Sequence, residues 1–82
     1  MYSASIKPDE MKQTMKAPEL VAVACSYQSR IQIRNNRGSF NAKSMMGMLA
    51  LDPTDGSLVI TAEGPDEEAA VHAVVHFLLE GF

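Results

Sequence analysis

The chain has 82 residues, which is enough for one small domain and too few for two. Its 7 basic and 10 acidic residues give a formal net charge of −3, which argues against a polycation that binds nucleic acid. The apolar fraction of 46% and the charged fraction of 21% are those of an ordinary globular domain. The single cysteine excludes an internal disulfide and a cysteine-based zinc cluster.

The sequence carries no sign of a membrane span or a signal peptide. No apolar run approaches the length that crosses a bilayer. Residues 1–16 mix polar and apolar side chains and include both lysines and acids, which a signal peptide does not. We therefore expect a cytoplasmic protein that is a monomer or a weak homodimer, with no membrane or nucleic-acid partner and no cofactor.

Charge is unevenly distributed along the chain. All seven basic residues lie between Lys7 and Lys43 together with three acidic ones, so this part carries +4. From residue 44 onward there are seven acidic residues and no lysine or arginine, so this part carries −7. The asymmetry predicts a basic and an acidic surface, which would orient the approach of a charged partner.

The chain first predicts a strand at residues 2–7 and then a helix at residues 18–26. Pro18 is tolerated near a helix start, where its missing N–H has no helical partner. Helical spacing places four side chains on one predicted buried face: Leu20, Val23, Ala24 and Tyr27.

A hairpin follows. Residues 30–34 alternate strictly, which puts Ile31 and Ile33 on one face of a strand and polar side chains on the other. Asn35–Gly38 is typical of a turn, and residues 39–42 predict the returning strand.

The second half predicts a short helix, a strand and a long helix. Residues 44–51 form the short helix, with Ser44 as its N-cap. The β-branched residues within 57–62 predict a strand, and residues 66–80 predict a helix with acids in its first turn. The apolar face of this last helix consists of Val71, Val74, Val75, Leu78 and Phe82. The order β-α-β-β-α-β-α favours an α+β fold with helices on one face of an antiparallel sheet.

The segment from Asn41 to Leu51 contains a Lys-Ser pair, Lys43-Ser44, followed by large apolar residues on a short helix. It resembles the regulatory-serine segment of HPr, the small phosphocarrier of the bacterial sugar phosphotransferase system. Ala62-Glu63-Gly64, followed by an acidic helix start, also resembles that family. The resemblance spans residues 6–82 and implies one domain, an open-faced β-sandwich with a four-stranded antiparallel sheet and three helices on one face.

The sequence departs from the family at the active centre. HPr proteins carry a phosphorylatable histidine at the start of their first helix, whereas the first histidine here is His72. Counting back from Ser44 places Gln13 at the family's histidine position, and aligning on Pro18 places Met15 there, with Ala17 in place of an arginine. Neither glutamine nor methionine presents a nucleophilic nitrogen. In this the chain is similar to the catabolite-repression HPr-like proteins, and we expect neither a catalytic residue nor enzyme activity.

Ser44 is the candidate phosphorylation site that the resemblance implies. An N-cap serine exposes its hydroxyl, and a phosphoryl group there adds about −1.5 to −2 charges beside the positive end of a helix. Lys43 would partly neutralise that charge. The plain alternative is a capping serine without regulation.

The residues after Ser44 are the candidate partner-binding surface. Met45, Met46, Met48 and Leu49 cannot all point inward from two helical turns, and methionine suits a surface that accepts several partners. We assign these four side chains and Lys43 to the partner-binding surface, and we expect about half of the apolar cluster to be part of the core instead.

Three other features have simpler explanations. His72 and His76 have a spacing that can hold a metal, but they supply two ligands only and are expected to be a solvated flank of their helix, so we predict no metal site. Cys25 is expected to be a buried structural thiol. A basic patch on the open side of the sheet would comprise Arg30, Arg34, Arg37 and Lys43, without the aromatic residues that stack on single-stranded nucleic acid.

The sequence thus predicts a non-catalytic regulatory or adaptor member of the family. Its partners would be phosphotransferase-system components, a serine kinase or a transcriptional regulator. Two alternatives stay open: a phosphocarrier whose chemistry has moved to His72 or His76, and an interaction domain that is never phosphorylated.

Overall fold

The computed structural model describes residues 1–7, 16–51 and 56–80. Within these ranges the elements follow the predicted β-α-β-β-α-β-α order, and each predicted boundary lies within one residue of the observed one. They are β1 (Tyr2–Ile6), α1 (Ala17–Cys25), β2 (Arg30–Asn35), β3 (Gly38–Asn41), α2 (Met45–Ala50), β4 (Leu58–Glu63) and α3 (Glu67–Glu80).

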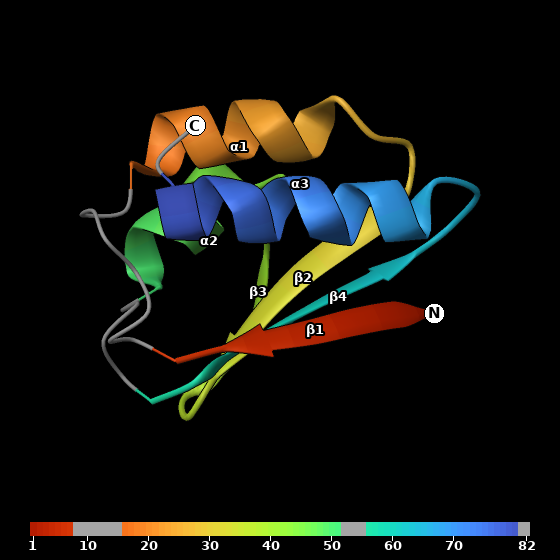
Figure 1. Cartoon of the computed structure of the whole chain (residues 1–82). Coiled ribbons are helices and arrows are strands. Elements are labelled where there is room, and N and C mark those ends of the chain that lie inside the picture. The colour runs from red at the N-terminus through yellow and green to blue at the C-terminus, as the bar shows by residue number, and fades with distance from the viewer. Residues whose placement is uncertain (8–15, 52–55, 81–82) are drawn as a thin grey trace.

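The strands form one antiparallel sheet in the order β1-β4-β2-β3. The hairpin of β2 and β3 pairs Ile33 with Phe40, and β4 lies between this hairpin and β1. Figure 1 shows all three helices on one face of the sheet, with α1 and α3 side by side. No helix in the described part of the chain covers the other face, which confirms the predicted open-faced architecture.

The two faces of the sheet differ because side chains alternate along each strand. On β2, Ile31 and Ile33 are fully buried, while Arg30 and Arg34 are exposed on the open face, as predicted. On β4, Leu58, Ile60 and Ala62 alternate in the same way and complete the buried face.

Helix α3 contributes the largest helical share of the core. Val71, Val74 and Leu78 are buried as predicted, and Val75 is half-buried. Phe77 is also buried, although it was not assigned to the apolar face. Phe82, which was assigned to that face, lies outside the described residues.

Helix α1 packs on the core through Leu20 and Ala24, both 0% exposed. Val23 and Tyr27 are half-buried, so the predicted face is broadly confirmed. The prediction of a buried Cys25 is wrong, because Cys25 is exposed. At about 100° per residue, five positions separate Cys25 from Leu20 by roughly 140° around the helix, which turns its thiol away from the sheet.

No helix in the described ranges has the length and apolar character needed to cross a bilayer. The longest of them, α3, has 14 residues.

The α2 surface and its capping serine

Ser44 caps α2 at its N-terminus, as predicted. Its backbone is extended, with φ −102° and ψ 122°, and its side-chain oxygen accepts a hydrogen bond from the Gly47 N–H at 3.1 Å. Its carbonyl accepts the first helical hydrogen bond, from the Met48 N–H at 2.9 Å. Such a cap satisfies a backbone donor at the helix start, and Ser44 as a whole is half-exposed.

The approach to Ser44 is fixed by Asn41, the last residue of β3. The Asn41 side-chain oxygen accepts a hydrogen bond from the Lys43 N–H at 2.9 Å, and its carbonyl accepts one from the Ser44 N–H at 3.0 Å. This local bonding to the two following residues is the usual behaviour of an asparagine in a turn. It holds the backbone of the Lys43-Ser44 pair in one conformation.

The side chain of Lys43 is directed at α1. Its ammonium group donates a hydrogen bond of 2.7 Å to the carbonyl oxygen of Tyr27, which follows Ser26, the C-cap residue of α1. The sequence predicted that Lys43 would partly neutralise a phosphoryl group on Ser44. It gave no indication of the hydrogen bond to Tyr27. Helix α1 has no basic residue in its own last turn, so Lys43 supplies the positive charge that a helix C-terminus favours.

Three large apolar side chains remain exposed on α2. Met45 is 40% exposed, Met46 82% and Leu49 68%, and we call these three residues the α2 surface. At about 100° per residue they occupy a single arc of the helix. Met48 is 1% exposed and packs in the core, so its assignment to the partner-binding surface is wrong. Its position on the helix lies outside that arc and faces α1 and the sheet.

The comparisons with known proteins identify the family. A family model described as "PTS HPr component phosphorylation site" matches residues 12–80. The chain belongs to the HPr family. The phosphocarrier protein HPr of Lysinibacillus sphaericus is 35% identical over 65 residues, which is 78% of this chain and 74% of that protein.

Solved structures of HPr proteins share the fold. The crystal structure of HPr-C-His from Thermoanaerobacter tengcongensis is 28% identical, covers 95% of this chain and 91% of its own, and superposes with a TM-score of 0.80. Crh, the catabolite repression protein of Bacillus subtilis, is 23% identical with a TM-score of 0.71, over 84% of this chain and 93% of that one. The Crh likeness shows the fold alone.

HPr proteins place their phosphorylatable histidine at the start of the first helix, as the resemblance implies. The two residues predicted at that position, Gln13 and Met15, lie outside the described residues. The described part begins at Lys16, which precedes α1 and makes no side-chain capping bond. Ala17 is 8% exposed, and the first turn carries the carboxylate of Glu19. The start of α1 therefore presents one positive and one negative side chain, Lys16 and Glu19.

Both histidines of this HPr-family chain lie exposed on α3. The His72 Nε2 atom lies 3.0 Å from the Tyr2 hydroxyl oxygen. The two rings also pack edge-on, with their centroids 5.4 Å apart. This contact joins α3 to β1. Within the described residues no group of three or more His, Cys, Asp or Glu side chains is arranged to hold a metal ion.

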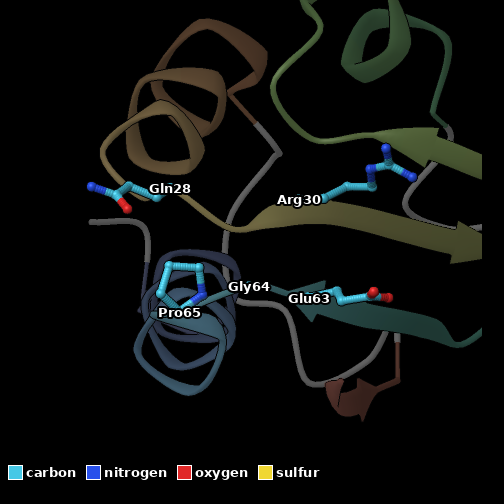
Figure 2. A pocket seen from close by; sticks show the side chains of 5 residues that line it. All are labelled: Gln28, Arg30, Glu63, Gly64 and Pro65. Atoms are coloured by element: carbon cyan, nitrogen blue, oxygen red, sulfur yellow. The ribbon is translucent and has the colours of Figure 1, made fainter.

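The predicted basic patch is dispersed. Arg30 and Arg34 are exposed on β2, whereas the Lys43 ammonium is bonded to the Tyr27 carbonyl beyond the end of α1. Arg30 pairs across the sheet with Glu63, and Figure 2 shows both side chains projecting to the same side. They border an open pocket of about 390 Å³ whose lining residues are Gln28, Arg30, Glu63, Gly64 and Pro65. Opposite charges therefore lie side by side here.

Two carboxyl groups near the start of α3 have displaced pKa values. Hydrogen bonds from the Ser29 hydroxyl and the Gln28 N–H lower the pKa of Asp66. A hydrogen bond from the amino group of Met1, 3.0 Å away, lowers the pKa of Glu67, and the Gly64 N–H acts in the same direction. Both groups stabilise the junction between β4 and α3 rather than a reactive centre.

Proposed function

We propose that the chain is a non-catalytic regulatory or adaptor member of the HPr family, which acts by binding other proteins through the α2 surface. The observation that carries this proposal is the exposure of Met46 and Leu49, at 82% and 68%, on a helix that a half-exposed serine caps. Large apolar side chains that remain in water at neighbouring positions mark a contact surface, and methionine adapts to partners of different shape. The expected partners are phosphotransferase-system components, a serine kinase or a transcriptional regulator, in the cytoplasm.

The absence of a histidine before His72 supports a role without phosphoryl transfer. A phosphocarrier needs a nucleophilic nitrogen and positive groups that hold the transferred phosphoryl group. At the start of α1 the structure offers the exposed Lys16 as the N-cap residue, but the carboxylate of Glu19 in the first turn repels an incoming phosphoryl group. His72 and His76 lie one helical turn from Glu68 and Glu80 respectively, so they too have acidic neighbours.

Phosphorylation of Ser44 would regulate this surface. In that step the Ser44 hydroxyl oxygen attacks the γ-phosphorus of ATP, an O–P bond forms, the bond to the bridging oxygen breaks, and ADP leaves. A base on the kinase takes the hydroxyl proton. The product carries about −1.5 to −2 additional charges directly beside Met45. A partner that accepts the apolar surface alone is then disfavoured, and one with basic groups beside its apolar contact is favoured.

Two intact-mass measurements test the phosphorylation chemistry. One sample contains phosphoenolpyruvate and the general phosphotransferase enzyme, and the other contains ATP and an HPr serine kinase. We expect one phosphoryl adduct in the ATP sample, absent from Ser44→Ala, and none in the other sample. An adduct formed from phosphoenolpyruvate would overturn the non-catalytic assignment, and an HPr phosphocarrier serves as the positive control in both samples.

The contact surface is tested separately by binding. The variants Met46→Ser and Leu49→Ser are expected to weaken binding to the HPr serine kinase by about tenfold or more, because each removes an exposed apolar anchor. Ala69→Ser, at an exposed position on α3, is the matched control and should bind as the wild type does. Equal affinities for all three variants would show that the contact lies elsewhere.

A further inference from the structure

Lys43 and Ser44 are adjacent in the chain, but their side chains are bonded to different elements. The Ser44 side-chain oxygen receives the Gly47 N–H of α2 at 3.1 Å. The Lys43 ammonium lies 2.7 Å from the Tyr27 carbonyl oxygen, beyond the end of α1. Asn41 fixes the backbone between them through the Lys43 N–H and the Ser44 N–H. The pair therefore links the capping serine of one helix to the C-terminal end of another.

The contact with Tyr27 matters because α1 ends without a positive charge of its own. Its last turn contains no basic residue. The carbonyl groups at a helix C-terminus lack helical partners and favour a nearby cation. Lys43 is half-buried and provides this cation from a residue 16 positions away in the sequence.

We propose that Lys43 is a positioning residue that transmits the phosphorylation state of Ser44 to the end of α1. The proposal rests on the proposed phosphorylation of Ser44. In the unmodified protein the Lys43 ammonium holds the neutral Tyr27 carbonyl. A phosphoryl group on the neighbouring residue offers the same ammonium an anionic acceptor, and the ion pair adds a Coulombic attraction that the neutral carbonyl of Tyr27 cannot provide. The flexible lysine stem then carries the ammonium from Tyr27 to the phosphate.

The consequence is a change on α1 without a change of fold. The Tyr27 carbonyl loses its cation and becomes accessible to water. The following amides stay in place, because the Gln28 and Ser29 N–H groups both donate to the carboxylate of Asp66. The response is thus confined to the segment at and just beyond the end of α1, where Cys25 and Ser26 are exposed. A partner that contacts both α1 and α2 would encounter two altered positions after one modification.

Nuclear magnetic resonance of the carbonyl carbon of Tyr27 tests this exchange directly, since its resonance position depends on hydrogen bonding. Phosphoserine is incorporated at position 44 during translation, so the experiment needs neither a kinase nor a binding partner. It is therefore independent of whether the proposed function is correct. The samples are the unmodified and the phosphorylated forms of the wild type, of Lys43→Met and of Lys16→Met, the last being a control that removes an exposed lysine outside the contact.

We expect phosphorylation to move the Tyr27 carbonyl resonance upfield in the wild type and in Lys16→Met. Unmodified Lys43→Met should already show the upfield position, and its phosphorylation should add no further shift. An unchanged Tyr27 carbonyl resonance in the phosphorylated wild type overturns the proposal. It is also overturned if phosphorylation shifts this resonance in Lys43→Met as much as it does in the wild type. If Lys43→Met does not fold, Lys43→Gln removes the charge while keeping a polar side chain, and the same two outcomes decide.

Discussion

Asp66 and Ser29 are joined by two hydrogen bonds across 37 residues of sequence. One carboxylate oxygen of Asp66 accepts from both the Ser29 N–H at 2.9 Å and the Ser29 hydroxyl at 2.5 Å. The other oxygen accepts from the Gln28 N–H at 2.9 Å. Ser29 is 1% exposed, so its hydroxyl needs this partner. The carboxylate thereby ties the start of α3 to the segment that leads into β2.

This network makes stability depend on pH. The hydrogen bonds lower the pKa of Asp66 below its unfolded value. A carboxyl group with a depressed pKa in the folded state contributes stability above its unfolded pKa, and the contribution is lost as the pH falls through the folded value. We expect the free energy of unfolding of the wild type to decrease on acidification below about pH 4, in urea titrations at a series of pH values.

The variant Asp66→Asn isolates this effect. It should lower the free energy of unfolding at neutral pH and flatten its acid dependence, because the titrating group has gone. Glu68→Gln, an exposed change on α3, is the control and should leave the acid dependence close to that of the wild type. A curve for Asp66→Asn that falls as steeply as the wild-type curve would assign the acid sensitivity to other groups.

Gly64 is predicted to tolerate no side chain. Its φ is +153°, and a Cβ atom there would approach the Ser29 Cα atom to 2.7 Å. Gly38 has a φ of +143° but nothing within 4 Å of such a Cβ atom. Gly38→Ala should cost about 1–2 kcal/mol from backbone strain alone. Gly64→Ala should cost about 1–3 kcal/mol more, because backbone atoms must move. Denaturant unfolding of the two variants measures the difference in their free energies of unfolding. Equal decreases in both variants would mean that Ser29 moves away from the new Cβ atom at no energetic cost.

Met46 is 82% exposed, whereas Met48 is 1% exposed. The two side chains therefore differ in their contribution to stability. Met48→Ala leaves a cavity in the core and should lower the free energy of unfolding by about 2–4 kcal/mol. Met46→Ala should change it by less than about 0.5 kcal/mol, since the side chain is already in water. Thermal or urea unfolding of both variants checks this prediction, and a large loss for Met46→Ala would contradict the assigned orientation of α2.

Ser44→Ala is expected to lower stability by about 1 kcal/mol, because the Gly47 N–H loses its side-chain acceptor. Ser44→Asp retains an acceptor at the N-cap and should recover most of that loss. The measurement is again the free energy of unfolding, accompanied by hydrogen exchange at the Gly47 amide. If Ser44→Ala leaves that amide as protected as in the wild type, the cap contributes little in solution.

Local features of the fold could be predicted from the sequence, and contacts between distant residues could not. Ser44 was identified as an N-cap because capping involves only the next three residues. The alternation of Ile31 and Ile33 placed them in the core because the period of a strand is two residues. Cys25 was misassigned because the composition of its neighbours suggested burial, whereas its angle around α1 decides the matter.

The contacts that hold the candidate site depend on tertiary structure. Asp66 was interpreted as an acid that complements the start of α3, and nothing in the sequence links it to Ser29. The partner of Lys43 is a backbone carbonyl, which carries no residue-specific signal. The last turn of α1 contains no basic residue, and nothing in the sequence indicated that Lys43 lies near its end.

The sheet order has a consequence for the way the protein assembles during synthesis. Tyr2 in β1 pairs with Ala62 in β4, 60 residues later, whereas β2 pairs with β3 across a tight turn. The hairpin of β2 and β3 can therefore form as soon as it leaves the ribosome, while β1 has no strand partner until β4 has emerged. Because β4 lies between β1 and the hairpin, β1 is made before the other three strands of this sheet but can join it only after β4 has been made. A nascent chain stalled before residue 58 should present a protease with an unprotected β1, and one released after residue 80 should not.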